Sequence, residues 1–251
     1  MNASLKSFLR RWQSLLLPFP LANANRLPAF LADRRRFRAM PGGSGLHWSD
    51  SYPCLGDATA TTTIDPHYFY QGAWLARRLA GRPPVHHTDV GSSVLMLGVM
   101  SGFVPTTFVD IRPLKVALSN FDCLPASITA LPFSDRSIAS LSCLHVIEHI
   151  GLGRYGDPVD PAGSRRAAKE LVRVLAPQGR LFLSTPVGRE RVCFNAHRIF
   201  SPFTVIEMFA PLSLVSFAWV DDGGTLQSEI SPADAARADY GCGLFEFSRE
   251  T

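Results

Sequence analysis

The chain has 251 residues, of which 46% are hydrophobic and 18% are charged, and its formal net charge is +4. That length and hydrophobic fraction suit one globular core with a small appendage. They exclude a strongly basic nucleic-acid-binding domain, because the basic residues concentrate in the first forty positions and the remainder is close to neutral.

The first predicted element is a basic amphipathic helix over residues 3–17, with apolar side chains at helical spacing and basic ones off that stripe. Such a helix could make a peripheral membrane contact, or it could pack on the main domain or a partner. A secretory signal is a further interpretation, which Pro18 and Pro20 inside the apolar run oppose. Residues 18–63 show no clear period and are predicted to form an irregular arm.

The cellular environment is suggested by cysteine usage and hydropathy. Five scattered cysteines with no C-x-x-C pair favour free thiols in a reducing compartment over a disulfide framework. The sequence has no run of about 18 uninterrupted apolar residues. We therefore expect a cytoplasmic protein, either free or peripheral at the inner face of a membrane, with an unknown oligomeric state and no nucleic-acid partner.

From residue 64 onward the pattern becomes that of an α/β protein. Asp65 and Pro66 predict the N-cap and first residue of a helix that continues to Ala80. Apolar runs bounded by turn residues then alternate with helical patterns, which indicates a doubly wound, mainly parallel sheet. We expect residues 1–63 to form an N-terminal extension and residues 64–251 the α/β domain. Strands are predicted at residues 85–90, 107–111, 121–126, 137–144, 180–185, 212–220 and 243–247, and helices at residues 163–175 and 202–209.

Two carboxylates lie at the ends of the first two predicted strands. Asp89 is followed by Gly91 in a small-residue turn, and Asp110 comes 21 positions after Asp89. In such a sheet ligands bind at the carboxyl ends of the strands, and an acid at the end of the second strand can accept hydrogen bonds from ribose hydroxyls. A nicotinamide-dependent oxidoreductase is disfavoured, because Ser92 and Ser93 replace further glycines of the dinucleotide fingerprint.

The stretch His145-Val-Ile-Glu148-His149 follows the fourth predicted strand and allows two interpretations. If it is helical, its two histidines share a face and could bind zinc with Glu148 as a base. Alternatively, it is the end of a buried strand and the start of the next helix, with the histidines beside a ligand. We favour the second interpretation and predict no metal site, because the first histidine stands at a strand end.

The order of these motifs resembles that of class I S-adenosylmethionine-dependent methyltransferases, over about residues 80–250. The resemblance rests on Asp89-Val-Gly91, Asp110, and the segments 131–137, 145–150 and 170–183. Residues 89–93, 109–113, 142–158 and 194–198 further resemble an uncharacterised family of methyltransferase-like domains, domain of unknown function 268. The resemblance implies a seven-stranded Rossmann-like sheet and S-adenosylmethionine as cofactor.

The resemblance also implies the cofactor contacts. The first motif would contact the methionine part, Asp110 would accept the ribose hydroxyls, and Ser127 with Ile128 would lie beside the adenine, where Ser127 replaces the usual acid. His145 would border the sulfonium. The predicted cofactor-binding residues are Asp89, Gly91, Ser92, Asp110, Ile111, Ser127, Ile128 and His145.

The remaining predictions concern catalysis and the acceptor. His149 with Glu148 is the best candidate for a general base, because methyl transfer to a hydroxyl requires proton removal, although both residues could instead stabilise a helix. The acceptor is expected to be a small polar molecule, with a glycan hydroxyl as an example. A non-catalytic scaffold with the same fold is the alternative. The predicted substrate-binding residues are Arg154, Tyr155, Asp157, Asn195, His197 and Arg198.

Overall fold

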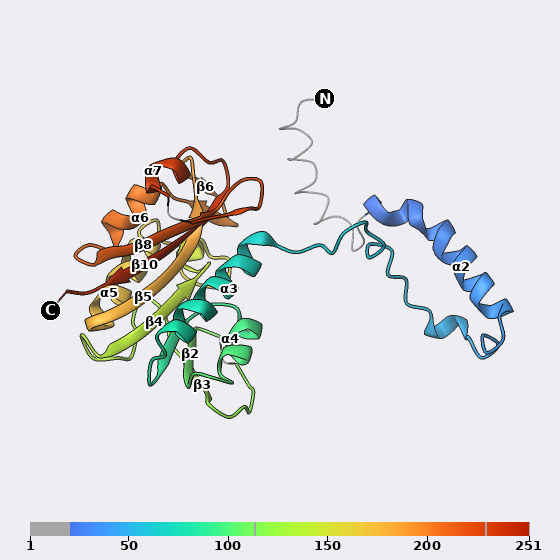
Figure 1. Cartoon of the computed structure of the whole chain (residues 1–251), viewed down its shortest axis with the longest axis horizontal. Helices are drawn as coiled ribbons and strands as arrows, with labels where there is room; N and C mark the ends of the chain where they lie inside the picture. The colour runs from blue at the N-terminus through green and yellow to red at the C-terminus, as the bar shows by residue number, and fades with distance from the viewer. Residues whose placement is uncertain (1–20, 113, 229, 251) are drawn as a thin grey trace. The chain divides into compact units, whose positions relative to one another are not determined.

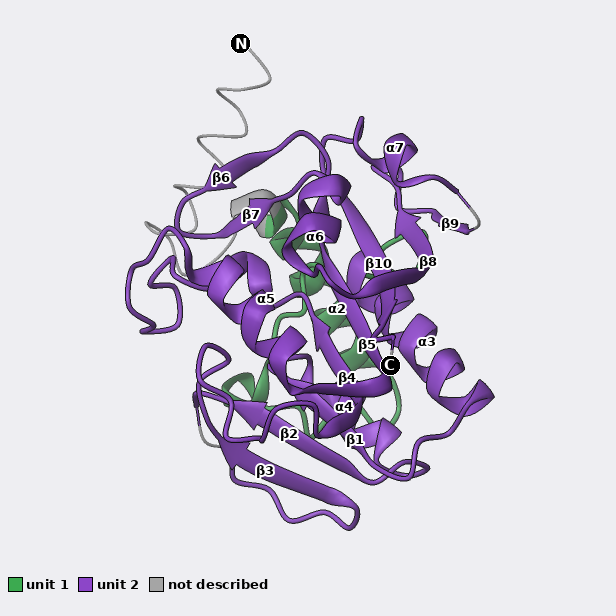
Figure 2. Cartoon of the chain, turned by 90° about the vertical axis from the view of Figure 1, so that its left-hand side faces the viewer, with its two compact units in different colours: residues 1–64 green, residues 65–251 purple. Residues whose placement is uncertain are grey.

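The computed structural model describes residues 21–112, 114–228 and 230–250. The chain divides into two compact units, residues 1–64 and residues 65–251 (Figure 2). The amphipathic helix predicted over residues 3–17 lies outside the described residues. Among the helices of the described ranges, none is both long enough and apolar enough to cross a membrane.

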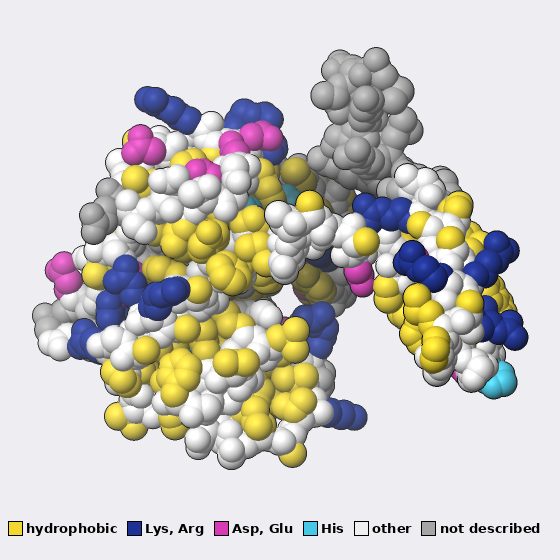
Figure 3. All heavy atoms as spheres, turned by 45° about the vertical axis from the view of Figure 1, so that its right-hand side comes forward, with side chains coloured by type: hydrophobic (Ala, Val, Ile, Leu, Met, Phe, Trp, Pro, Cys, Tyr) yellow, Lys and Arg dark blue, Asp and Glu magenta, His cyan; other side chains and the backbone are white. Residues whose placement is uncertain are grey.

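The described part of the first unit is built around one helix, α2 (Leu27–Ala39), which follows the 3-10 turn η1 (Leu21–Arg26). Another 3-10 turn, η2 (Trp48–Asp50), lies further along the chain. The Arg34 guanidinium stacks 4.4 Å from the centre of the Trp48 ring. Arg side chains reach the surface of this unit beside hydrophobic ones (Figure 3).

Helix α2 stands where the sequence predicted an irregular arm. None of its residues is buried, so it carries no core-facing apolar stripe for the sequence pattern to reveal. The helix instead reflects intrinsic propensity, because it is rich in Ala, Leu and Arg and has Pro28 in its first turn.

The second unit is built on an eight-stranded sheet (Figure 1). Its strands are β1 (His87–Val90), β2 (Thr106–Asp110), β3 (Phe121–Pro125), β4 (Ile138–Leu144), β5 (Leu175–Val187), β8 (Ser213–Val220), β9 (Leu226–Ser228) and β10 (Gly241–Ser248). Their order is β3-β2-β1-β4-β5-β10-β8-β9. The first five strands are mutually parallel, and β10 runs antiparallel to both β5 and β8. The predicted doubly wound α/β fold is confirmed, with β9 as an additional edge strand.

Helices cover both faces of this sheet, and each face has its own hydrophobic core. One core packs α5 (Gly163–Val174) and α6 (Pro202–Met208), and the other packs α3 (Pro66–Gly81) and α4 (Val94–Met100). Strand β5 contributes side chains to both cores, because alternate residues point to opposite faces of the sheet: Leu181 and Leu183 pack in the first core and Phe182 in the second. The remaining short elements are η3 (Ile147–His149), α7 (Pro232–Ala235) and the hairpin β6 (Arg191–Cys193) with β7 (His197–Ile199).

Two local details position the site. The predicted N-cap is confirmed, because Asp65 Oδ1 accepts hydrogen bonds from the backbone N–H groups of His67 (3.0 Å) and Tyr68 (3.3 Å). After β4 the predicted helix does not form: His145 has a φ of 54°, and only the single turn η3 follows before a loop leads to α5. His145 and His149 therefore do not share a helical face.

Candidate functional site

A pocket of about 150 Å³ opens at the carboxyl ends of β1, β2 and β4, where the strand order reverses. This is the position at which open α/β sheets bind ligands. The predicted site residues on its wall are Gly91, Asp110, Ile111, Ser127, Ile128, His145, His149, Tyr155 and Asp157. The remaining predicted residues lie outside this wall.

Gly91 forms the floor of the turn after β1. Its φ is 75°, and a Cβ built on it would lie 3.0 Å from Val146 Cγ1. A side chain would therefore be strained and would crowd the wall of the pocket. Glycine at this position keeps the backbone open to a ligand.

Asp110 reaches the pocket from the end of β2, with its side chain 10% exposed. Both of its carboxylate oxygens already accept hydrogen bonds from Arg112: Oδ1 from the backbone N–H (2.7 Å) and Nε (3.1 Å), and Oδ2 from Nη2 (3.2 Å). The Arg112 guanidinium also stacks 4.6 Å from the centre of the Tyr155 ring, and that of Arg154 stacks at 5.1 Å. Because the Arg112 side chain is 60% exposed, it is free to leave the carboxylate without unfolding a core.

Asp89 is fully buried and does not line the pocket. Its Oδ1 accepts from the Ser92 backbone N–H (3.0 Å), and its Oδ2 accepts from the hydroxyls of Ser92 (2.7 Å) and Ser142. The Ser92 hydroxyl also accepts from Leu144 N at 2.9 Å. Asp89 and Ser92 thus tie the turn after β1 to β4, and their predicted contact with a cofactor would act through that turn.

The Asp89 network continues to His87, whose ring nitrogens lie 2.8 Å from the hydroxyls of Ser140 and Ser142. Burial raises the pKa of Asp89 to about 6, although hydrogen bonds from Ser142 and Ser92 lower it. Burial lowers the pKa of His87 to about 3. Both groups are therefore held neutral at mildly acidic pH.

Replacing Asp89 with asparagine is expected to make the free energy of unfolding rise more steeply with pH. As pH rises from 3.8 to about 6, wild type loses stability at Asp89, because the native state holds that proton more tightly than the unfolded chain. His87 has the opposite effect from about 3 to 6.5, where the unfolded chain binds more protons. The asparagine removes only the first effect. Urea unfolding of wild type and Asp89→Asn between about pH 3 and pH 6.5 measures the difference. If the free energy of unfolding has the same pH dependence in both proteins, the raised pKa of Asp89 is contradicted.

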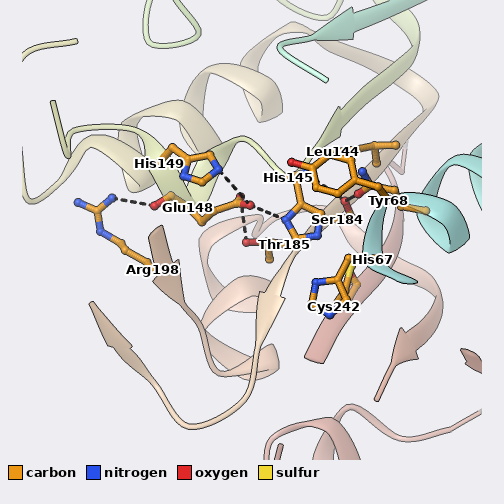
Figure 4. A network of polar contacts seen from close by, with 12 residues as sticks. His67, Tyr68, Leu144, His145, Glu148, His149, Ser184, Thr185, Arg198 and Cys242 are labelled. Atoms are coloured by element: carbon orange, nitrogen blue, oxygen red, sulfur yellow. Dashed lines mark hydrogen bonds and ion pairs between the residues drawn. The ribbon is translucent and has the colours of Figure 1, made fainter. Parts of the chain in front are cut away.

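His145 directly follows β4 and forms a buried ion pair with Glu148, with 2.7 Å between His145 Nδ1 and Glu148 Oε1 (Figure 4). Burial alone would lower the pKa of His145, but Cys242 and Glu148 outweigh it and raise that pKa well above its usual range. Burial alone would raise the pKa of Glu148, but His145 outweighs it and lowers that pKa. Glu148 is completely buried, so it acts on the pocket only through its neighbours.

His149 lines the pocket as a neutral imidazole. Its Nδ1 donates to the carbonyl of Ala196 at 2.7 Å, which leaves the lone pair on Nε2. That nitrogen lies 3.7 Å from Glu148 Oε1, too far for a hydrogen bond. Burial lowers the pKa of His149, which favours the basic form at neutral pH.

The predicted substrate residues divide into two groups. Tyr155 and Asp157 line the pocket, and the exposed Arg154 stacks on Tyr155. Arg198 is buried, and its Nη1 donates to the Ile150 carbonyl (2.7 Å) and the Ser164 hydroxyl (3.0 Å), so it supports the loop from beneath. Asn195 and His197 lie in or beside the β6–β7 hairpin and off the pocket wall. Their roles toward a substrate stay predictions.

The sequence did not indicate four residues near His145: His67, Tyr68 and Cys242 lie beside it, and Tyr240 lies beside His67. The rings of Tyr68 and His67 each stack on that of His145 at 5.4 Å, and the Tyr240 ring lies 5.1 Å from His67. His67 and Tyr68 come from α3, Tyr240 directly precedes β10 and Cys242 lies within it, all far from His145 in sequence. The confirmed N-cap at Asp65 was the available signal, since it puts His67 and Tyr68 in the first turn of a helix.

The sheet order and pocket of the second unit define a class I methyltransferase fold, and solved structures agree. The N-methyltransferase NodS from Bradyrhizobium japonicum WM9, solved with S-adenosylhomocysteine, superposes with a TM-score of 0.53 at 16% identity, covering 88% of this chain and 98% of that one. A putative sarcosine dimethylglycine methyltransferase from Galdieria sulphuraria superposes with a TM-score of 0.53 at 13% identity, covering 72% and 85%. The cyclase SpnF does so with a TM-score of 0.51 at 15% identity, covering 71% and 81%.

Within this unit, residues 134–230 match the DUF268 family, described as a Caenorhabditis protein of unknown function. The predicted resemblance to both groups is therefore confirmed. No curated protein matches the chain in sequence. At these identities the structural neighbours establish the fold alone. SpnF is described as a cyclase and not as a methyltransferase, so the same fold occurs in proteins with different activities.

Proposed function

We propose that the second unit binds S-adenosylmethionine and transfers a methyl group to a small polar acceptor. The observation that carries the proposal is the presence of Gly91, Asp110 and Ser127 on the wall of one pocket at the reversal of strand order. A neighbour with the same fold, NodS, was solved with S-adenosylhomocysteine, which supports this choice of cofactor.

The residues of the pocket fit such a cofactor. The bare backbone at Gly91 suits the methionine part, Asp110 can accept from ribose hydroxyls, and Ser127 can hydrogen-bond the adenine. Ile111 and Ile128 offer apolar surface to the purine ring. The bound cofactor would supply an electrophilic methyl group.

The acceptor would approach from the side of the pocket formed by Tyr155 and Asp157. His149 lines that pocket, and its neutral imidazole can take a proton from an acceptor hydroxyl, while buried Glu148, 3.7 Å from Nε2, stabilises the resulting positive charge. A glycan hydroxyl suits these polar groups. The expected cytoplasmic or peripheral location remains part of this proposal.

A second candidate function is a non-catalytic scaffold with the same fold. The Asp110 carboxylate is occupied by Arg112, and the pocket volume of about 150 Å³ is below the roughly 300–1,000 Å³ of typical ligand sites. Cofactor binding therefore requires Arg112 to move. A scaffold would have no such requirement.

Calorimetric titration with S-adenosylhomocysteine separates the two candidates. We expect saturable binding with one site per chain, because the donors and acceptors for the nucleoside face one cavity. NAD serves as the control ligand and should not bind, since the turn after β1 lacks the glycines for a pyrophosphate. Absence of binding at millimolar S-adenosylhomocysteine would leave the scaffold as the better description.

A further inference from the structure

Three side chains with metal-binding atoms meet beside the pocket. One imidazole nitrogen of His67, one of His145 and the Sγ of Cys242 lie within 4.8 Å of one another. Figure 4 shows the three side chains converging from the start of α3, the end of β4 and the start of β10. We propose that they bind one divalent cation, with zinc as the best match. This proposal is independent of methyl transfer and of the cofactor.

His145 supplies the strongest argument. Its side chain is only 6% exposed, and its Nε2 is buried without a hydrogen-bond partner among the described residues. A buried nitrogen of this kind costs free energy unless something binds it, and a bound cation would replace the proton that Nε2 carries in the ion pair with Glu148. The neighbouring His67 and Cys242 are the groups that share that space.

The other nitrogen of His145 is already arranged as in known metal sites. Glu148 Oε1 holds Nδ1 at 2.7 Å, and Glu148 is itself completely buried. Metal-binding histidines almost always donate their second ring N–H to a carboxylate, a carbonyl or water, which fixes the tautomer and directs the other nitrogen at the ion. Glu148 therefore positions the His145 ring and is not itself a ligand. The three proposed ligands are His145, His67 and Cys242.

Cys242 provides the charge that selects the metal. Its side chain is fully buried, and its Sγ lies 3.9 Å from the Gly243 carbonyl, a weak contact. A buried thiolate is costly unless a cation neutralises it. Two imidazoles with one thiolate suit zinc, and hard cations such as Mg²⁺ prefer oxygen ligands.

The geometry needs little adjustment for zinc. Zinc binds imidazole at about 2.0 Å and thiolate at about 2.3 Å in a tetrahedral arrangement, which separates ligand atoms by roughly 3–4 Å. The three ligand atoms now lie within 4.8 Å of one another, and small side-chain rotations would shorten these distances to the roughly 3–4 Å that suits zinc. Three protein ligands leave a fourth position for water or a substrate atom. The ligand set also differs from the sequence motif, because His149 Nδ1 is used by the Ala196 carbonyl.

The competing explanation is aromatic packing. His145 stacks on both His67 and Tyr68 at 5.4 Å, and stacked rings need no ion. Packing alone gives the thiol no special role. The two explanations therefore differ in what loss of the Cys242 sulfur does to metal binding.

The test uses the full chain without a polyhistidine tag, stripped of metal by a chelator and titrated with Co²⁺ and then Zn²⁺. We expect one equivalent of Co²⁺ per chain, with the intense visible bands of a tetrahedral ion and a thiolate-to-cobalt charge-transfer band, both lost when Zn²⁺ displaces it. Cys242→Ala should abolish the charge-transfer band and weaken Zn²⁺ binding at least tenfold. His67→Ala, which changes a half-buried side chain, should weaken binding comparably.

The matched control is Cys143→Ala, because Cys143 is an equally buried free thiol two residues before His145. It should keep both the band and the affinity. Thermal melting in chelator establishes that each variant is folded. Failure of the wild type to bind Co²⁺ or Zn²⁺ at micromolar concentration would overturn the proposal, as would an unchanged band in Cys242→Ala. The titration with S-adenosylhomocysteine is a separate measurement, so either proposal can fail alone.

Discussion

Replacing Asp110 with alanine is expected to weaken S-adenosylhomocysteine binding by about a hundredfold. A carboxylate that accepts two hydrogen bonds from a ribose contributes about 1.5–3 kcal/mol for each bond, and part of that sum is offset because Arg112 no longer competes. Calorimetric titration measures the change. The matched control is Asp122→Ala, which removes an exposed acid from the adjacent strand β3 and should leave the affinity unchanged.

Arg112→Ala is expected to have the opposite effect on the affinity for S-adenosylhomocysteine. Because Arg112 occupies both carboxylate oxygens of Asp110, its removal should tighten binding of the same ligand severalfold. Weaker binding in Arg112→Ala would mean that the guanidinium holds the ligand instead of excluding it. An unaltered affinity in Asp110→Ala would remove Asp110 from the site altogether.

Replacing Glu148 with alanine is expected to lower the free energy of unfolding by about 3–5 kcal/mol, the usual cost of removing one partner from a buried ion pair. Glu148 is fully buried, with Oε1 at 2.7 Å from His145 Nδ1 and Oε2 at 3.3 Å from the Thr185 hydroxyl. Its loss leaves the His145 ring buried without its carboxylate. Urea unfolding in the presence of a chelator measures the effect without a contribution from metal.

Two further variants test whether the loss of stability comes from the buried ion pair. Glu148→Gln keeps an acceptor oxygen for His145 and should cost less than the alanine, because it loses only the charge. Glu207→Ala is the matched control, since that side chain is 71% exposed, and it should change stability little. A loss below about 1 kcal/mol in Glu148→Ala would show that His145 and Glu148 do not form the buried pair.

The sheet and half of the pocket could be predicted from the sequence because the relevant signals are local. Asp110 ends the strand β2 and Ser127 comes two residues after β3, so their places at the carboxyl edge follow from chain order alone. The N-cap at Asp65 is equally local. Helix α2 was missed because none of its residues is buried, so its sequence lacks the periodic apolar pattern that a packed helix shows.

The surroundings of His145 could not be predicted in the same way. Cys242 lies about a hundred residues after His145 and reaches it because β10 enters the sheet antiparallel beside β5. His67 arrives from the opposite direction along the chain, on a helix that precedes the first strand. Only the tertiary fold brings these side chains together, and the burial that orphans His145 Nε2 is likewise a tertiary property.

The contacts of the Tyr155 ring with the guanidinium groups of both Arg112 and Arg154 have a kinetic consequence for the proposed function. Under the proposed function, a nucleoside that takes the Asp110 carboxylate would displace Arg112, and Tyr155 would lose one of the two cations that stack on its ring. That loss would loosen the loop that bears Tyr155 and Asp157 as the nucleoside half of the cavity fills. Such coupling favours a compulsory order of association, in which the nucleoside binds first and the second ligand enters afterwards.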